Sequence, residues 1–255
     1  MIVLVTGATS GFGAAIARRF AAEGHHLIAV GRRSERLAAL VQELGSARVH
    51  AVALDVRDRA AVQAAVAALP GELAAVDLLV NNAGLALGLG PAQEADLDAW
   101  ERMVDTNVKG LMYVTRALLP GMVARNRGHI VNIGSIAATH PYPGGNVYGG
   151  TKAFVRQFSL NLRADLLNTR VRVTDVEPGL VGGTEFSVVR FEGDQQRAAR
   201  LYEGTDALTP EDIAEAVHWV ATLPARVNVN ILELMPVTQA FGPLPVHRDT
   251  SGPRP

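Results

Sequence analysis

Tyr148 and Lys152 lie four residues apart, at the start of a run with helical composition. Residues at this spacing project from the same face of a helix. A phenol has a pKa of about 10 in water, and a fixed cation beside it favours the phenolate and lowers that pKa. The pair could therefore exchange a proton with an alcohol near neutral pH. The alternative is a surface tyrosine and lysine that share this spacing by chance.

The composition predicts one globular domain, residues 1–255, with 48% hydrophobic and 19% charged residues and a net charge of −1. This charge balance gives no reason to expect nucleic acid or an anionic membrane as a partner. The absence of cysteine excludes disulfides and thiolate metal sites, and the scattered histidines indicate no metal site. No apolar run reaches the length of a membrane span or resembles a signal peptide, so we expect the cytoplasm.

Strands and helices alternate along the chain, which is typical of an α/β Rossmann fold with a doubly wound parallel sheet and helices on both faces. Helices are predicted to begin with Ser34 and Asp58 as N-caps and with Pro210 in the first turn, and Pro120 is predicted to disturb the end of a helix over 97–124. Segment 182–204 predicts a substrate flap with one short helix, and the proline-rich tail 241–255 lies outside the central elements. The seven predicted strands cover 2–5, 26–30, 49–54, 77–80, 128–135, 171–176 and 228–235.

Gly7, Gly11 and Gly13 follow the first predicted strand and precede a helix. Glycines let the backbone approach a pyrophosphate, and the helix N-terminus supplies N–H donors and a positive dipole. An ordinary strand-to-helix turn is the alternative. The position of the turn after the first strand favours a dinucleotide site.

Gly31, Arg32 and Arg33 follow the second predicted strand, where an NAD site usually has an acidic residue for the ribose 2′-hydroxyl. A carboxylate would repel a 2′-phosphate, whereas guanidinium groups bind it. The arginine pair therefore predicts NADP rather than NAD. A solvated pair of charges at a helix start is the alternative, but it does not explain the missing acid.

A set of motifs spread from the first strand to the last resembles that of the short-chain dehydrogenase/reductase family. Within the family, the chain is similar to NADP-dependent 3-hydroxy acid dehydrogenases, also described as malonic semialdehyde reductases, L-allo-threonine dehydrogenases or serine 3-dehydrogenases. The resemblance implies an oxidoreductase that acts on small hydroxy acids and assembles as a homotetramer, with the helices of Asn107 and Tyr148 at one interface. The motifs are Thr6-Gly7-x-x-x-Gly11-x-Gly13, Asn81-Asn82-Ala83-Gly84, Asn107, Ser135, Tyr148-x-x-x-Lys152 and Pro178-Gly179.

The resemblance also implies a role for each catalytic residue. Tyr148 is the general acid in reduction and the base in oxidation, and Lys152 lowers its pKa and holds the nicotinamide ribose. Ser135 donates a hydrogen bond to the substrate oxygen. Asn107 holds a water that links Lys152 to solvent. This role would explain an asparagine in the middle of a helix, where the residue is otherwise unfavourable. Gly149 and Gly150 depart from the commonest pattern and are expected to weaken the helix start.

The remaining site residues are predicted to bind cofactor or substrate. Arg190, Arg197 and Arg200 are candidates for a substrate carboxylate; Arg190 is preferred because its surrounding stretch resembles the 3-hydroxy acid subgroup, and a solvated surface arginine is the alternative. His140 and Tyr142 either line the pocket or are ordinary loop residues. The predicted cofactor-binding residues are Gly7, Thr9, Ser10, Gly11, Phe12, Gly13, Arg32, Arg33, Asp55 and Val56 at the adenine, Asn82, Ala83 and Gly84 at the adenosine ribose, Tyr148, Lys152, and Pro178, Gly179, Val181 and Thr184 at the carboxamide.

Two further functions stay open. One is a short-chain reductase of another small carbonyl compound or secondary alcohol. The other is a non-catalytic NADP sensor, which would keep the glycine turn and Arg32 but would not need Tyr148, Lys152, Ser135 and Asn107 together. A serine hydrolase built on Ser135 is disfavoured because the Gly-x-Ser-x-Gly pattern is absent.

Overall fold

The computed structural model describes residues 1–242 and contains one seven-stranded sheet, in which all pairs are parallel and the order is β3-β2-β1-β4-β5-β6-β7. The order reverses between β1 and β4, which confirms the doubly wound Rossmann prediction. Of the predicted tail 241–255, residues 243–255 lie outside the described part of the chain. The strands are β1 (Ile2–Thr6), β2 (His26–Gly31), β3 (Val49–Ala53), β4 (Leu78–Asn81), β5 (Gly128–Ile133), β6 (Val171–Pro178) and β7 (Ile231–Leu234).

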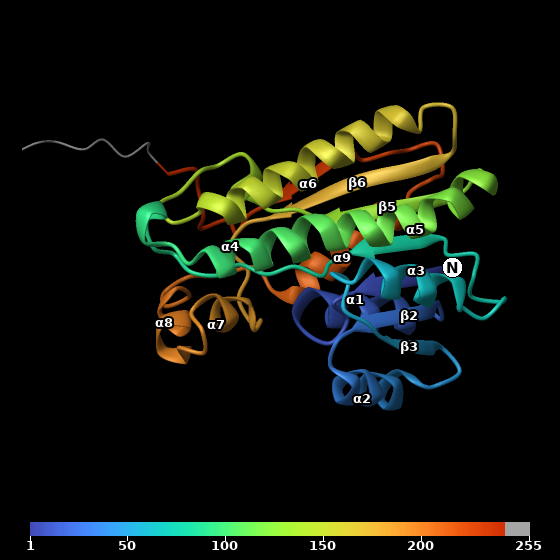
Figure 1. Ribbon diagram of the computed structural model, residues 1–255, viewed down its shortest axis with the longest axis horizontal. Helices are drawn as coiled ribbons and strands as arrows, with labels where there is room; N and C mark the ends of the chain where they lie inside the picture. Colours follow the sequence, from blue (N-terminus) through green and yellow to red (C-terminus); the bar gives the residue numbers. More distant parts are fainter. Residues whose placement is uncertain (243–255) are drawn as a thin grey trace, which may run out of the picture.

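Helices cover both faces of the sheet, and Figure 1 shows α4, α5 and α6 grouped along β5 and β6. The short helices α7 and α8 lie at the end of the molecule toward which β6 runs (Figure 1). The helices are α1 (Gly11–Ala22), α2 (Ser34–Leu44), α3 (Arg59–Ala67), α4 (Leu97–Val104), α5 (Leu111–Ala124), α6 (Asn146–Asp165), α7 (Phe186–Arg190), α8 (Gln195–Arg200) and α9 (Pro210–Thr222), with 3₁₀ turns η1 (Ala92–Glu94) and η3 (Ile136–Ala138) and a π-helical segment η2 (Asp105–Gly110).

The core has a layer on each side of the sheet, because successive strand residues point to opposite faces. One layer packs α1 and α9 on the sheet through side chains such as Phe20 and Val217. The other packs α3, α5 and α6 through side chains such as Val62 and Leu162. Both layers contain fully buried strand residues, so the sheet is fixed from both faces and its carboxyl ends form a rigid platform.

Three of the predicted helix starts can be compared with the structure. Asp58 caps α3 by accepting from the backbone N–H of Ala61 at 2.9 Å, and Pro210 is the first residue of α9, as predicted. Ser34 is not the N-cap of α2: that position belongs to Arg33, which has an extended backbone and makes no capping bond. The Arg33 side chain is instead engaged by Thr9 and Glu185.

Two predicted helical segments differ from the structure, and the strands predicted over 128–135 and 228–235 are shorter than predicted, as Gly128–Ile133 and Ile231–Leu234. The helix predicted over 97–124 is interrupted by η2 rather than disturbed at Pro120, which lies inside an α5 that continues to Ala124. The segment 182–204 contains two short helices, α7 and α8, rather than one. Neither α7 nor α8 is long enough to give a clear helical period in the sequence.

Among residues 1–242, no helix combines the length and the apolarity that a membrane crossing needs. The same part of the chain contains no cluster of three or more His, Asp or Glu side chains arranged to hold a metal ion.

Candidate active site

The turn after β1 is held by Asn82, which follows β4. The Asn82 side-chain amide donates to the Thr6 carbonyl at 2.9 Å, and the Thr6 hydroxyl accepts from the backbone N–H groups of Asn82 and Ala83 at 3.0 and 2.9 Å. Gly7 has a φ of +67°, and a Cβ on Gly13 would collide with the Gly7 carbonyl. The glycines therefore let β1, α1 and the strand end at β4 approach one another closely.

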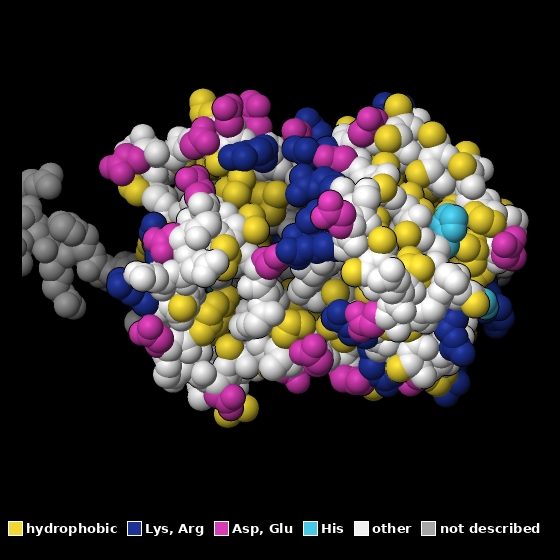
Figure 2. Space-filling view, turned by 90° about the horizontal axis from the view of Figure 1, so that it is seen from below, with side chains coloured by type: hydrophobic (Ala, Val, Ile, Leu, Met, Phe, Trp, Pro, Cys, Tyr) yellow, Lys and Arg dark blue, Asp and Glu magenta, His cyan; other side chains and the backbone are white. Residues whose placement is uncertain are grey.

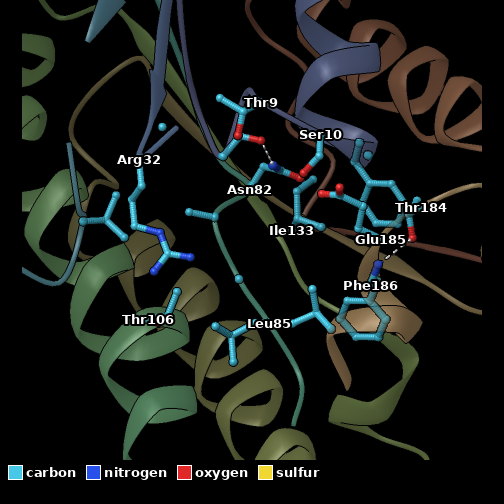
Figure 3. A pocket seen from close by; sticks show the side chains of 18 of the residues that line it. Thr9, Ser10, Arg32, Asn82, Leu85, Thr106, Ile133, Thr184, Glu185 and Phe186 are labelled. Atoms are coloured by element: carbon cyan, nitrogen blue, oxygen red, sulfur yellow. Dashed lines mark hydrogen bonds between the residues drawn. The ribbon is translucent and has the colours of Figure 1, made fainter. Parts of the chain in front are cut away.

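A cavity of about 300 Å³ opens at the carboxyl ends of β1, β2 and β4. Figure 3 shows side chains from the glycine turn, from Arg32 and from the flap facing it. The predicted site residues that line it are Gly7, Thr9, Ser10, Gly11, Phe12, Arg32, Arg33, Asp55, Val56, Asn82, Ala83, Gly84, Tyr148, Lys152 and Thr184.

Some predicted site residues do not line this cavity. Gly13 packs on Gly7, and Gly179 packs so closely on Gln239 that a Cβ would collide with its side chain. Val181 forms an isolated β-bridge with Leu208. The others are Pro178, Asn107, Ser135 and Arg190. Lining residues that were not singled out from the sequence are Val30, Leu54, Leu85, Thr106, Ile133, Gly134, Glu185, Phe186 and Val189.

Arg32 lies at the edge of the cavity with a side chain that is 62% exposed, and its guanidinium is 4.0 Å from the Asp55 carboxylate. The preceding residue cannot be acidic without a rearrangement, because a Cβ on Gly31 would lie 2.7 Å from Cγ2 of Thr9. A side chain at position 31 would therefore require Thr9 to move. Figure 2 shows a band of Lys and Arg side chains beside a hollow on this side of the molecule.

Arg33 and Arg36 both bind the carboxylate of Glu185 in the flap, at 2.9 and 2.8 Å. The Arg36 hydrogen bond, with Arg33 adding to it, lowers the pKa of Glu185 to about 2. Glu185 and Arg36 were not predicted as site residues, because nothing in the sequence indicates that the flap returns to α2. The carboxylate joins the flap to the predicted 2′-phosphate site.

Tyr148 and Lys152 lie in the first two turns of α6 and are both buried. The Lys152 ammonium is 5.8 Å from the centre of the Tyr148 ring and donates to the Ile133 carbonyl at 2.7 Å. The helical spacing therefore places the two side chains together, as predicted.

The pKa values of this pair differ from the prediction that Lys152 lowers the pKa of Tyr148. Burial raises the pKa of Tyr148 to about 12, although the neighbouring Ser135 hydroxyl and the Arg190 guanidinium act in the other direction. Burial also lowers the pKa of Lys152 to about 8. The prediction was wrong for this structure because desolvation outweighs the nearby polar and charged groups and because Lys152 is hydrogen-bonded to Ile133.

Ser135 lies two residues beyond the end of β5 and is the N-cap of η3, where its hydroxyl accepts from the Ala137 backbone N–H at 3.1 Å. Its neighbour η3 packs closely against α6: a Cβ on Gly149 would lie 3.2 Å from the Ala137 carbonyl oxygen. Gly150 has open space instead. The first glycine of the pair therefore allows a close approach that brings Ser135 near Tyr148, and the second has no packing role.

Asn107 is buried in the π-helical segment η2. Its side-chain amide donates to the Leu85 carbonyl at 2.8 Å and to the Thr151 hydroxyl at 3.1 Å, and its Oδ1 accepts from the Leu85 N–H at 2.9 Å. A Cβ on Gly84 would lie 3.3 Å from this Oδ1 and 3.7 Å from the Lys152 ammonium. A π bulge at Asn107 therefore explains a mid-helix asparagine and places it beside Lys152.

Arg190, at the end of α7, reaches back to Tyr148. Its guanidinium donates to the Tyr142 hydroxyl at 2.5 Å and to the Gly88 carbonyl at 3.3 Å. The guanidinium carbon lies 5.4 Å from the centre of the Tyr148 ring and 5.9 Å from that of Phe186. A partly buried cation thus stands next to the phenol.

The other candidate substrate residues have different neighbours. Arg197 lies over the ring of Phe191 at 4.4 Å, inside the flap, and Arg200 is exposed on α8. The His140 ring is 3.4 Å from the Glu233 carboxylate and 4.3 Å, centroid to centroid, from Phe241. Among the three arginines, Arg190 is the one that the structure brings to the tyrosine.

Residues 1–195 match the family model described as short chain dehydrogenase. The chain belongs to the short-chain dehydrogenase family. It is 67% identical over 248 residues to a protein of Salmonella typhi named NADP-dependent 3-hydroxy acid dehydrogenase YdfG, a match that covers 97% of this chain and 100% of that protein. It is 53% identical over 248 residues to the serine 3-dehydrogenase of Rhizobium radiobacter, covering 97% and 98%.

Solved structures similar to this chain include serine dehydrogenases, in agreement with the relatives found by sequence. The structure described as the closed form of serine dehydrogenase complexed with NADP+ has a TM-score of 0.96 and 64% sequence identity, over 98% of this chain and 100% of that one. A crystal structure of serine dehydrogenase from Escherichia coli has a TM-score of 0.85 and 60% identity, over 94% and 100%.

The cavity of this short-chain dehydrogenase fits a dinucleotide with a 2′-phosphate. Its glycine turn brings backbone N–H groups at the start of α1 to the cavity, which suits a pyrophosphate. The exposed guanidinium of Arg32 at the edge of the cavity suits a 2′-phosphate, and the glycine before it carries no competing acid.

Proposed function

We propose that this short-chain dehydrogenase interconverts 3-hydroxy acids and their 3-oxo acids or semialdehydes, with NADP as its cofactor. The substrates are of the L-serine, L-allo-threonine, 3-hydroxypropionate and 3-hydroxyisobutyrate type, and malonic semialdehyde is one of the oxidised products. The observation that carries this proposal is the Arg190 guanidinium 5.4 Å from the Tyr148 ring. The names of the relatives support it, since they include 3-hydroxy acid dehydrogenase and serine 3-dehydrogenase.

The cofactor is held by the residues that line the cavity. NADP, when bound, supplies hydride transfer at its nicotinamide ring. Arg32 binds the 2′-phosphate, with Arg33 beside it held by Glu185, and the glycine turn with the N-terminus of α1 binds the pyrophosphate. Thr184, at the start of the flap, holds the carboxamide end.

Proton transfer occurs at the Tyr148 hydroxyl. This hydroxyl gives its proton to the substrate oxygen in reduction and takes it back in oxidation. Ser135 donates a hydrogen bond to the same oxygen, where negative charge develops. Because burial raises the pKa of Tyr148 to about 12, the phenol is protonated at neutral pH, which is the state that reduction requires.

Lys152 and Asn107 connect the phenol to solvent. With a pKa of about 8, the Lys152 ammonium can return a proton near neutral pH. Asn107, fixed by both backbone groups of Leu85, holds a water beside Lys152 for this relay.

Substrate choice depends on the carboxylate. Arg190 is partly buried, oriented by Tyr142 and Gly88, and surrounded by aromatic rings. A charge-assisted hydrogen bond to a carboxylate contributes more in such a place than on an open surface. Simple alcohols lack this contact, so a hydroxyl two carbons from a carboxylate is favoured over an isolated one.

We also propose that the enzyme is a cytoplasmic homotetramer, with the Asn107 and Tyr148 helices at one interface. Large apolar side chains exposed on the neighbouring helices α4 and α5 support this assembly: they are Leu97, Met112 and Val123. Sedimentation should give the mass of four chains, and a monomer would contradict the assembly.

A substrate panel tests the proposed function. NADP⁺-linked oxidation is measured with L-serine, L-allo-threonine, 3-hydroxypropionate and 3-hydroxyisobutyrate, and with simple secondary alcohols. Higher kcat/KM on hydroxy acids supports the proposal. Higher kcat/KM on secondary alcohols indicates a general alcohol dehydrogenase, and tight NADP binding without turnover indicates a sensor.

A further inference from the structure

Two acidic side chains of β6, Asp175 and Glu177, are fully buried although neither belongs to the predicted site. They are two residues apart on one strand, so they project from the same face of the sheet. That face is covered by α6, because Val171 and Val173 of the same alternation pack with Leu162. Burying two like charges is unfavourable unless their surroundings compensate for it.

Asp175 lies directly beneath the loop that holds the catalytic groups. A Cβ on Gly134 would lie 2.5 Å from Asp175 Oδ1, so glycine is required above this carboxyl. The residue before Gly134 is Ile133, whose carbonyl accepts from the Lys152 ammonium at 2.7 Å, and the residue after it is Ser135. The acid is therefore packed under the backbone that fixes both Lys152 and Ser135.

Glu177 is held from the helix above. The Arg156 guanidinium lies 2.5 Å from its Oε2, and Arg156 is one helical turn beyond Lys152. Tyr148, Lys152 and Arg156 thus follow one another at intervals of four residues along one side of α6. Two cations of α6 face two acids of β6.

The oxygens of the two acids indicate a shared proton. As two carboxylates, Asp175 and Glu177 leave three oxygens without a hydrogen-bond partner, namely Oδ1 and Oδ2 of Asp175 and Oε1 of Glu177. A proton on Asp175 turns one of its oxygens into a donor to Glu177, which gives each carboxyl a hydrogen-bond partner. Burial raises the pKa of Asp175 to about 8, Glu177 adds to the shift, and Lys152 and Arg156 oppose it.

The charged groups around Asp175 are few among residues 1–242. On α6 they are Lys152 and Arg156, and on β6 the neighbour is Glu177. The facing residue of β5 is the uncharged Asn132, whose amide donates to Ser159.

Few further charged side chains lie near Asp175 and Glu177 in the described part of the chain. On β7, Glu233 pairs in register with Glu177, and its carboxylate is 3.4 Å from His140. His129 and Thr174 bond to each other at 2.8 Å on the opposite face of the sheet. Among residues 1–242, Asp175 is therefore the acid whose charge acts on Lys152.

We propose that Asp175 and Glu177 are positioning residues that share one proton and set the charge of Lys152. At neutral pH Asp175 carries the proton, and Arg156 pairs with Glu177. As the pH rises, Asp175 releases its proton to solvent, and the new carboxylate keeps Lys152 protonated to a higher pH than its burial alone would allow. The consequence for turnover rests on the proposed function, in which charged Lys152 serves the Tyr148 proton.

The shared proton can be tested on the wild-type protein without activity. Infrared spectra of protein labelled with ¹³C at the aspartate side-chain carboxyl should show the C=O stretch of a protonated acid at pH 7. The band should disappear as the pH is raised to about 10, because the pKa of Asp175 is about 8. Surface aspartates are ionised at pH 7 and give no such band. Its absence at pH 7 would overturn the proposal.

The effect on Lys152 is tested by Asp175→Asn, with Thr174→Val as a matched change on the opposite face of the same strand. In the pH profile of kcat, the alkaline limb of Asp175→Asn should lie lower than that of the wild-type protein by about 0.5 pH unit or more, because a negative charge near Lys152 is lost. Thr174→Val should keep the wild-type limb. An unmoved limb in a folded Asp175→Asn protein would refute the proposal.

The infrared band and the pH profile of kcat distinguish failure of the shared-proton proposal from failure of the proposed function. If Asp175→Asn does not fold, the infrared band of the wild-type protein decides. If the wild-type protein has no NADP-linked activity on any substrate, the proposed function fails, while the band still reports whether Asp175 holds a proton.

Discussion

The guanidinium carbon of Arg190 lies 5.4 Å from the centre of the Tyr148 ring, although the two residues belong to different elements 42 positions apart. Tyr142 completes this arrangement, since its hydroxyl accepts from Arg190 and its ring lies 5.5 Å from the guanidinium carbon. A phenol and a cation able to bind a carboxylate are thereby held at one place. The proposed hydroxy acid site requires this geometry, and a general alcohol site does not.

Tyr142→Phe should raise KM for the hydroxy acid about 3- to 10-fold and leave kcat nearly unchanged. The change removes the hydroxyl that orients Arg190, and one hydrogen bond to a charged group is worth roughly 1.5–3 kcal/mol at most. Steady-state kinetics on 3-hydroxypropionate measures it. A fall in kcat with unchanged KM would place Tyr142 in the chemistry instead.

Tyr148→Phe should reduce kcat at least ~10²-fold, because the substitution removes the hydroxyl that transfers the proton. NADP binding should persist, since the cavity keeps its glycine turn and Arg32. Turnover and cofactor titration by fluorescence are measured on the same preparation. Near-normal turnover would remove Tyr148 from its role.

Arg32→Ser should lower kcat/KM for NADP⁺ about 10-fold or more, because a charge-assisted contact with the 2′-phosphate contributes roughly 1.5–3 kcal/mol. The kinetics with NAD⁺ provide the internal control and should change little, as NAD⁺ has no 2′-phosphate. Wild-type enzyme should prefer NADP⁺ strongly. Equal kcat/KM for the two cofactors in wild-type enzyme would contradict the assignment of Arg32.

Gly150→Ala should stabilise the protein by roughly 0.5–1 kcal/mol, because alanine favours the helix and nothing lies within 4 Å of the new methyl group. Gly149→Ala is the matched control. It places the same group 3.2 Å from the Ala137 carbonyl oxygen and should give no gain or a loss. Thermal unfolding measures both. Equal stabilisation by the two changes would show that Gly149 has no packing role.

Much of the fold follows from local patterns. Apolar runs bounded by glycine or polar residues correctly predicted seven strands, and Asp58 was recognisable as an N-cap because its role depends on a residue three positions away. The spacing of Tyr148 and Lys152 likewise placed both on one face of α6. Each of these features is encoded within a few residues.

What the sequence did not reveal depends on distant contacts. Glu185 reaches Arg33 across 152 positions, and the π-helical segment at Asn107 is stabilised by Leu85, 22 positions away. The pKa of Tyr148 was predicted in the wrong direction because the cost of burial depends on the complete fold. The acid pair under Gly134 was overlooked because a carboxylate in a strand shows no sign of its partners.

The most direct measurement compares kcat/KM for 3-hydroxypropionate and for 1-propanol, which lacks the carboxylate, in wild-type enzyme and in Arg190→Met. Arg197→Met serves as the control, since Arg197 packs on Phe191 in the same flap. The wild-type and control enzymes should prefer the acid by at least ~10-fold, from the roughly 1.5–3 kcal/mol of a charged hydrogen bond. Arg190→Met should lose most of that preference. A preference unchanged by Arg190→Met would contradict the assignment of Arg190 to the substrate carboxylate.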